Sequence, residues 1–353
     1  MSHIRRLARI PDIAQLAGVS TATVDRVLNQ RPGVRNATVQ RVLQAAASLG
    51  YLPESELAGT PVPQAPKQVL RLMVLIPEGS NRFLQMLGDV IGYAEEHLAA
   101  FNVRCQAAYI ESFNPEALAR ALLHHGKRCD GIAFMALEHP VVREAVAQLA
   151  EQGVPTVTLI SDLSNSRRVA YVGLDNRAAG RTAAYLIARF IGQQAYSHQT
   201  RVAMIVGSLR YRAHEEREAG FLHLFEEQFP LVQVVGVREG HDDAERNYEQ
   251  ARRLIEQHPD LAGIYNIGGG AEGIGRALKE TGTDRKIVLI GHGLTPDTRA
   301  LLIDGTMDAV ITQNPLGAVM NCVRIFANLR DGQEITKGVE VTRSQVIFRE
   351  NLP

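Results

Sequence analysis

The sequence contains 353 residues, and at about 100 to 200 residues per domain this length corresponds to two or three domains. Hydrophobic residues make up 45% and charged residues 22%, a balance that excludes an intrinsically disordered chain. Lys plus Arg and Asp plus Glu number 38 each. Residues 1–53, however, contain seven Arg against two Asp, net +5, which leaves 31 basic and 36 acidic residues, net −5, for the remainder. The sequence therefore predicts a small basic module on a mildly acidic body.

The cysteines and the amino terminus indicate the cellular compartment. Cys105, Cys129 and Cys322 are far apart and show no CxxC spacing, so we interpret them as buried free thiols rather than a disulfide framework or a zinc cluster. The first residues include arginines but no apolar stretch of signal-peptide length, and nowhere do about 18 apolar residues follow one another. These features favour a cytoplasmic protein without a membrane partner.

Three helices are predicted in the first fifty residues. The first ends before Gly18, and Ser20 is a good N-cap for a second helix over 21–29. The second helix buries valines and a leucine, so its polar residues lie on the opposite side. A third helix over about 38–49 repeats apolar residues at helical spacing and stops at Gly50. This order is the plan of a DNA-binding helix-turn-helix.

A three-helix bundle whose arginines only maintain solubility is the alternative. DNA binding is favoured because the second helix exposes small polar residues and one arginine within a basic segment. Arg26 can donate two hydrogen bonds to O6 and N7 of a guanine. The side chains of Ser20, Thr23 and Asn29 suit phosphate contacts, which fix the register without reading the sequence.

Four segments carry a family resemblance: Asp12-Ile13-Ala14, Ala17-Gly18-Val19-Ser20, Thr23-Val24-Asp25-Arg26-Val27-Leu28-Asn29 and Gly50-Tyr51-Leu52-Pro53. They resemble the DNA-binding head of the lactose-repressor/galactose-repressor family of bacterial transcription regulators. The resemblance implies that Thr21, Ala22 and Arg26 read bases. The residues that it places beside phosphates are Ile10, Ser20, Thr23, Asn29, Arg35 and Thr38. Asp25 departs from the family's usual serine, and its carboxylate is expected to repel phosphate or to point toward a cytosine amine or Arg26.

A proline-rich linker is predicted at 59–68, between a DNA-binding domain at 1–58 and a ligand-binding domain at 69–353. In the family that the head resembles, this region contains a hinge helix whose leucine wedges into the minor groove. The corresponding stretch is shortened and acidic in this sequence, and Leu57 is the residue that would supply the wedge. A plain tether without groove contacts is the alternative.

From Val69 onward, predicted strands alternate with helices, which indicates doubly wound parallel sheets. The strands are expected at 69–76, 103–110, 131–136, 155–160, 201–206, 232–239, 263–266, 287–290 and 308–312. This number of strands is larger than a single sheet usually contains, so two α/β lobes are expected. Lobe one is assigned to about 69–171 and 312–340, and lobe two to about 172–311 and 341–353. Ligands bind such sheets at the carboxyl ends of the strands, where two lobes share a cleft.

Polar residues follow several of these strands. Residues 69–340 resemble the effector domain of the same family, which is similar to periplasmic sugar-binding proteins. By that resemblance, Asn81 and Phe83 match a segment that contacts and stacks on a sugar, and Arg217 matches an arginine that binds ring hydroxyls. The remaining ligand-binding candidates are an acidic hydroxyl acceptor, Asp162, a late polar contact, Gln313, and two strand-end residues, Asn266 and His292. For each of them a capping or packing role is the alternative.

Two departures from the family pattern bear on the ligand. The usual Asn-Asp pair after the 263–266 strand is replaced by Asn266 followed by Ile267 and three glycines, and His292 follows the 287–290 strand where an Asp is expected. The pocket thereby loses carboxylates and gains backbone amides and an imidazole. Our hypothesis is a sugar, polyol or sugar acid with an acidic or less hydroxylated end, rather than a plain hexose.

An enzyme is the main alternative from another functional class. Gly268, Gly270 and Gly273 satisfy GxGxxG after a strand, the pattern of dinucleotide-binding enzymes. The next strand, however, ends in Gly291-His292 where an acidic residue for the ribose is required. No Walker lysine motif, HExxH or GxSxG occurs, so catalysis has no positive support and no cofactor or metal is predicted.

The sequence thus predicts a DNA-binding transcription regulator, expected to act as a repressor, whose operator affinity responds to a small ligand between two lobes. A homodimer is expected to read a pseudo-palindromic operator of double-stranded DNA. A sugar-binding protein without a regulatory role is the other alternative. It would need an export signal and no basic head, and this sequence has the reverse.

Overall fold

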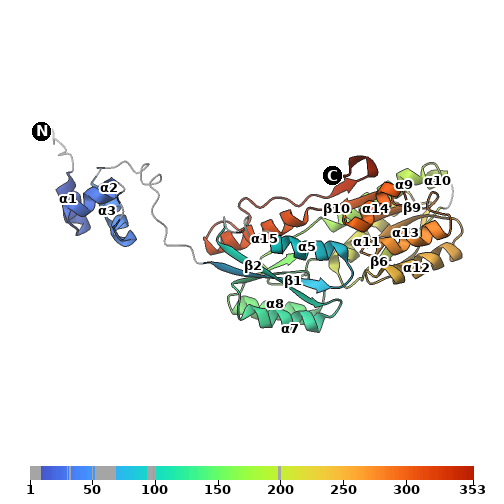
Figure 1. Cartoon of the computed structure of the whole chain (residues 1–353), viewed down its shortest axis with the longest axis horizontal. Coiled ribbons are helices and arrows are strands. Elements are labelled where there is room, and N and C mark those ends of the chain that lie inside the picture. Colours follow the sequence, from blue (N-terminus) through green and yellow to red (C-terminus); the bar gives the residue numbers. More distant parts are fainter. Residues whose placement is uncertain are drawn as a thin grey trace. The chain divides into compact units, whose positions relative to one another are not determined.

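The computed structural model describes residues 9–29, 31, 33–49, 51, 69–93, 98, 101–197 and 200–353. The chain divides into two compact units, Met1–Gln68 and Val69–Pro353. Many of the elements of both units are labelled in Figure 1.

The smaller unit contains three helices, α1 (Ile10–Ala17), α2 (Thr21–Leu28) and α3 (Asn36–Ser48). Gly18 has a left-handed φ of 64° and allows the chain to leave α1 sharply. The Ser20 side chain then accepts a hydrogen bond from the Thr23 backbone and caps α2. The helices enclose one core whose fully buried members include Ile13, Val24 and Val42. The predicted helix-turn-helix with its supporting helix is confirmed.

Lobe one of the larger unit is a parallel sheet with the strand order β2-β1-β3-β4-β5. Its strands are β1 (Leu70–Glu78), β2 (Val103–Glu111), β3 (Gly131–Phe134), β4 (Thr156–Leu159) and β5 (Ala170–Val172). Helices α7 (Pro115–Gly126) and α8 (Pro140–Glu151) cover one face, and α5 (Arg82–Tyr93) and α15 (Pro315–Arg330) cover the other (Figure 1). Because both faces are covered, β3 and β4 are buried along their whole length.

Lobe two is a sheet with the strand order β11-β10-β9-β8-β6-β7. Its strands are β6 (Thr200–Val206), β7 (Val232–Glu239), β8 (Leu261–Asn266), β9 (Val288–His292), β10 (Ala309–Thr312) and β11 (Gln345–Ile347). One core lies between the sheet and helices α9 (Asn176–Ile191) and α11 (Arg212–Gln228), which the short α10 (Gln194–Ser197) adjoins. A second core lies under α12 (Ala244–Gln257), α13 (Ala271–Glu280) and α14 (Pro296–Asp304). The chain ends in the short helix η1 (Arg349–Asn351).

The predicted class of two doubly wound α/β lobes is confirmed, and the sequence reading missed two short strands. β5 is a three-residue strand just before the chain enters lobe two, and β11 pairs antiparallel with β10. Both are too short to show a hydrophobic period. Thr312 closes β10 and so belongs to lobe two, one residue beyond the expected lobe boundary.

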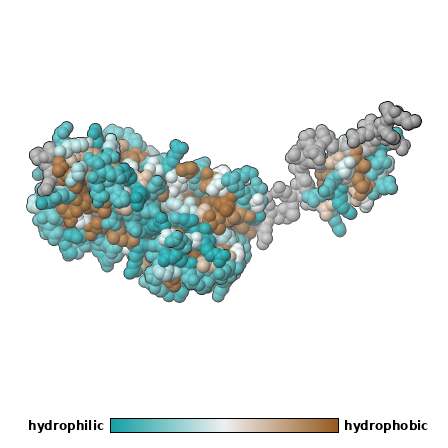
Figure 2. Space-filling model, turned by 180° about the vertical axis from the view of Figure 1, so that it is seen from behind, coloured by the Kyte–Doolittle hydropathy of each residue, from teal (hydrophilic) through white to brown (hydrophobic). Residues whose placement is uncertain are grey.

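The surface of the described residues is predominantly hydrophilic, and hydrophobic residues interrupt it in separate patches on the face drawn in Figure 2. In the part of the chain that the structure describes, no helix combines the length and the apolar character that a membrane span requires.

Candidate functional site

The exposed side of α2 forms the first candidate site. Thr21, Ala22 and Arg26 are all exposed, while Val24 and Val27 on the other side are buried in the core. This division follows from the helical period, which places positions three and four apart on one face. The three residues predicted to read bases therefore share one accessible surface.

The structure gives Asp25 partners that the sequence did not indicate. Its carboxylate accepts a hydrogen bond from the Asn29 side chain at 2.8 Å and forms an ion pair with Arg31 at 3.4 Å. The expected contact with Arg26 is not among the interactions of the described residues, so the Arg26 guanidinium remains available to a ligand. Asn29 also donates to the Asp25 carbonyl, which holds its amide at the end of α2.

The predicted phosphate-contact residues lie on or beside the three helices of the smaller unit. Ser20 and Thr23 share a hydrogen bond of 2.9 Å between their hydroxyls. Arg35 is exposed at the N-cap of α3, and Thr38 is half-buried in its first turn. Ile10 is half-buried and packs against the core of the smaller unit. Leu57 and the linker at 59–68 lie outside the described residues.

The second candidate site is a cleft between the two lobes. It lies where strands β1, β3, β4, β8, β9 and β10 end, as expected for doubly wound sheets. The candidate residues that line it are Asn81, Phe83, Arg217, His292 and Gln313. Its apolar lining includes Met135, Ile160, Leu174, Ile267 and Ile311.

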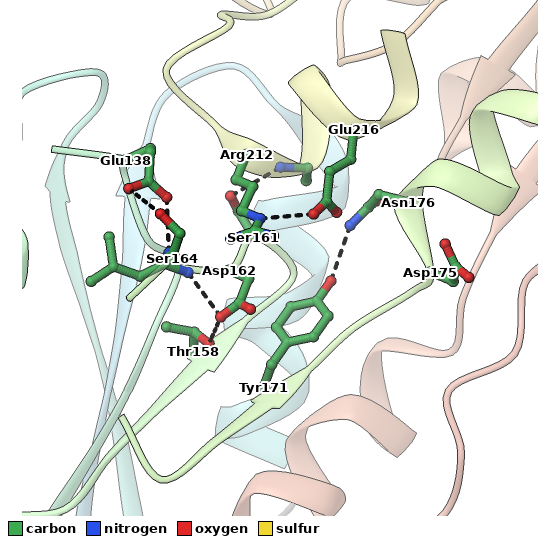
Figure 3. Close-up of polar contacts among 12 residues, drawn as sticks. Glu138, Thr158, Ser161, Asp162, Ser164, Tyr171, Asp175, Asn176, Arg212 and Glu216 are labelled. Atoms are coloured by element: carbon green, nitrogen blue, oxygen red, sulfur yellow. Dashed lines mark hydrogen bonds and ion pairs between the residues drawn. The ribbon is translucent and has the colours of Figure 1, made fainter. Parts of the chain in front are cut away.

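Arg217 is held in this cleft by two hydrogen bonds. Its Nε donates to Asn176 Oδ1 and its Nη1 donates to the Ile267 carbonyl, both at 2.9 Å. The Asn176 amide in turn donates to the Tyr171 hydroxyl at 3.0 Å, a contact drawn in Figure 3. The chain of bonds connects the segment that crosses between the lobes to the cleft wall. Burial lowers the pKa of Arg217.

Two buried histidines accompany this arginine. His292 Nε2 lies 2.6 Å from the hydroxyl of Tyr265, whose ring stacks on Phe221. His214 Nδ1 lies 2.9 Å from the Ser208 carbonyl oxygen. Burial lowers the pKa of His292 well below its usual value and that of His214 to about 4, so both imidazoles are neutral near pH 7.

Asn81 has a structural role beside its place in the cleft. Its Oδ1 accepts hydrogen bonds from the backbone of Phe83 and Leu84 and thereby caps α5. Its amide donates to Asp242 of lobe two at 3.0 Å. Gln313 is 5% exposed, and its Oε1 has no hydrogen-bond partner among the described residues.

Asp162 and Asn266 are not among the residues that line the cleft. The Asp162 carboxylate pairs with Arg168 and accepts a hydrogen bond from the Thr158 hydroxyl. Figure 3 shows the contact with Thr158 in the loop after β4. The Asn266 amide donates to the carbonyls of Gly268 and Gly269, so it shapes the turn before α13.

The glycines of the GxGxxG pattern have packing explanations. Gly270 has a φ of 69° at the start of α13, a conformation that side chains disfavour. A Cβ at Gly273 would lie 1.8 Å from the Ala244 carbonyl, because α12 and α13 pack closely there. Gly268 packs so closely against Asp242 and Gly207 that a Cβ would clash with both.

Sequence reasoning missed several residues of the site. His214 lines the cleft, and Asn176 and Asp242 orient residues that do. The only signal in the sequence was the position of Asn176 in the segment that passes into lobe two. Asp242 gives no signal, because its partner Asn81 is 161 residues away along the chain.

Comparison with known proteins agrees with this architecture. Residues 9–54 match the bacterial regulatory proteins of the lacI family, and residues 74–334 match the periplasmic binding protein domain. Catabolite control protein A of Priestia megaterium is 26% identical over 259 residues, 72% of each chain. An uncharacterized HTH-type transcriptional regulator of Streptomyces limosus is 28% identical over 98% of this chain and 92% of its own. The structure of GanP, a glucose-galactose binding protein from Geobacillus stearothermophilus, has a TM-score of 0.71 at 25% identity and covers 81% of this chain and 100% of its own.

Proposed function

Since this chain belongs to the lacI family of bacterial regulatory proteins, we propose that it represses transcription by binding a specific operator, and that a ligand in its interlobe cleft changes the operator affinity. The observation that carries the proposal is the combination, in one chain, of an exposed Thr21, Ala22 and Arg26 surface with a two-lobed cleft. A sugar-binding protein without a regulatory role would have no use for that surface.

The proposal includes a homodimer. Two helix-turn-helix units related by a twofold axis would read the two halves of a pseudo-palindromic operator in successive major grooves. Binding to chromosomal DNA implies a location in the cytoplasm, at the bacterial nucleoid.

The ligand of the cleft is proposed to be a small sugar, polyol or sugar acid. The resemblance of residues 74–334 to periplasmic binding proteins and the hydrogen-bonding groups around Phe83 support this class. To regulate, the ligand must bind one lobe arrangement more tightly than the other, by about 1 to 3 kcal/mol in ordinary allosteric coupling.

A binding role without catalysis is part of the proposal. The comparisons give regulators and sugar-binding proteins, and the glycines at Gly268, Gly270 and Gly273 are explained by tight turns and packing. These observations argue against the alternative of a dinucleotide-binding enzyme.

Operator binding by the full chain tests the proposal. A DNA site selected from a random library is labelled, and its affinity is measured by fluorescence anisotropy for the wild type and Arg26→Ala. We expect the substitution to weaken binding by about 1 to 3 kcal/mol, with the largest effect at one base pair. Arg41→Ala, an exposed arginine on α3, is the control, and its effect is expected to be similar on every sequence.

If Arg26→Ala weakened the affinity equally for all DNA sequences, Arg26 would be a phosphate contact, and the base-reading assignment would be contradicted. Failure of the full chain to select any DNA sequence would contradict the proposed function as a whole.

A further inference from the structure

The cleft contains a buried positive charge whose partners are neutral. Arg217 is 6% exposed and donates to the amide oxygen of Asn176 and the carbonyl of Ile267. Among the residues that the structure describes, no carboxylate forms an ion pair with this guanidinium. A buried charge without a counter-ion is strongly unfavourable, since hydrogen bonds to neutral groups replace only part of its hydration.

The other ionisable groups of the cleft do not supply the missing negative charge. His214 and His292 are neutral, because burial lowers the pKa of both imidazoles. Burial raises the pKa of Glu272, which disfavours the charged form of this carboxyl. Asp297 pairs with Arg82 at 3.5 Å, so its charge is balanced there.

Two carboxylates near Arg217 remain, Glu216 and Asp242, and both are occupied. Glu216 pairs with Arg212, and Asp242 has two hydrogen-bond donors of its own. One of its oxygens accepts from the Asn81 amide at 3.0 Å and the other from the Gly269 backbone at 2.6 Å. It therefore stabilises Arg217 only through space. The direct counter-ion position beside the guanidinium is left to a ligand.

A second group in the cleft also lacks a partner. Gln313 lines the cleft and is 5% exposed, and its Oε1 accepts no hydrogen bond from any described residue. Buried acceptors are nearly always satisfied, so a donor such as a ligand hydroxyl is expected at this position. The ring of Phe83 provides an apolar surface for the carbon skeleton.

We propose that the effector is an anionic, hydroxylated compound, whose carboxylate or phosphate group pairs with Arg217 and whose hydroxyl donates to Gln313. This inference rests on the proposed function and specifies the ligand class of the same cleft. Carboxylate and phosphate share the chemistry that a guanidinium recognises, so the two sources are separated by experiment.

Isothermal titration of the full chain with matched pairs of compounds tests the inference. The pairs are D-gluconate with D-glucitol, D-galacturonate with D-galactose, and D-glucose 6-phosphate with D-glucose. We expect the anion of at least one pair to bind at least tenfold more tightly than its neutral partner. The pair that shows this preference identifies carboxylate or phosphate as the recognised group. If no anion binds more tightly than its neutral partner, the inference is wrong.

Arg217→Gln assigns the preference to this residue. It is expected to remove most of the anion preference, so that the anion and its neutral partner bind with affinities within about threefold of each other. Arg212→Gln is the matched control, because Arg212 precedes Arg217 on α11 and pairs with Glu216 outside the cleft lining. An anion preference that survives in Arg217→Gln overturns the assignment. If this variant does not fold, the wild-type pairs still decide whether the ligand is anionic.

Operator binding is measured on the same wild-type preparations. A chain that binds its operator but prefers neutral sugars contradicts only this inference. A chain that binds anions but selects no DNA contradicts the proposed function instead.

Discussion

The side-chain amide of Asn81 in lobe one donates a hydrogen bond of 3.0 Å to the carboxylate of Asp242 in lobe two. The Ser80 hydroxyl makes a second bond between the lobes, to the Asp242 carbonyl at 2.8 Å. The other carboxylate oxygen of Asp242 accepts from the Gly269 backbone. Asp242 thus bridges the lobes beside the cleft. Its left-handed φ of 58° accompanies the placement of both its carboxylate and its carbonyl against these partners.

Asp242→Asn tests this bridge. An Asn side chain has one acceptor oxygen, whereas Asp242 accepts from two donors, so one of those donors would face an NH2 group. We expect the arrangement of the lobes that Asp242 bridges to lose about 1 to 3 kcal/mol, measured as weaker ligand binding. Asn also tolerates the left-handed backbone, so the change leaves the backbone conformation accessible.

The adjacent Asp243 provides the control. Its carboxylate caps α12 by accepting from the Arg246 backbone, and Asn caps helices equally well, so Asp243→Asn is expected to change little. Equal ligand affinities for the two variants would show that the bridge does not hold the lobes together.

Asp25→Ala is expected to strengthen non-specific DNA binding. The substitution removes a negative charge from the surface that we propose to face DNA and releases Arg31 from its ion pair. If Arg31 then neutralises one phosphate, the slope of log affinity against log salt becomes steeper by about 0.9. The stability cost is about 1 kcal/mol or less, because the pair is exposed. A titration of salt against a non-specific duplex measures this, and an unchanged slope would contradict the idea.

The lowered pKa of His214 predicts that the protein loses stability at mildly acidic pH. Its pKa is about 4 in the folded chain and about 6.5 when unfolded, so below pH 6.5 the unfolded state binds a proton that the folded state does not. The contribution of the neutral histidine to the free energy of unfolding is fully present above pH 6.5 and falls by about 1.4 kcal/mol per pH unit toward pH 4. When the pH falls from 7 to 5, the free energy of unfolding measured with urea should therefore drop by roughly 2 kcal/mol less in His214→Gln than in the wild type.

The same urea experiment between pH 7 and pH 8 is the control, since the histidine is then neutral in both states. Identical losses for wild type and variant between pH 7 and pH 5 would mean that His214 is protonated in the folded protein.

Gly220→Ala should be destabilising by about 1 to 3 kcal/mol. A Cβ at Gly220 would lie 2.1 Å from the Arg177 carbonyl, and one at Gly180 would lie 1.9 Å from the Arg217 carbonyl, so α9 and α11 touch backbone to backbone. Separating them also displaces Arg217. Gly92→Ala on α5 is the control, because a Cβ there meets nothing within 4 Å and Ala favours helix by about 0.5 to 1 kcal/mol. Similar denaturant midpoints for the two variants would argue against this close packing.

Periodicity and strand order were sufficient for much of this architecture. They place Arg26 on the outer side of α2, and they place His292 and Gln313 at strand ends that meet in one cleft. They do not place Asp162, because a carboxylate after a strand looks the same whether it faces a ligand or an arginine six residues later. The role of Asp242 could not be predicted for a similar reason, since it depends on a backbone angle and on a partner that is distant in the sequence.

The return of α15 to lobe one affects how the protein is made. Val323 and Phe326 of α15 complete the core of a sheet whose last strand, β5, ends at Val172. Between Val172 and Pro315, where α15 begins, the ribosome must add 315 − 172 = 143 residues. At 5 to 20 residues per second this takes roughly 7 to 30 s. Throughout that interval the part of the sheet face that α15 covers is exposed beside α5, so the lobe that begins synthesis first stays incomplete until most of lobe two has been made.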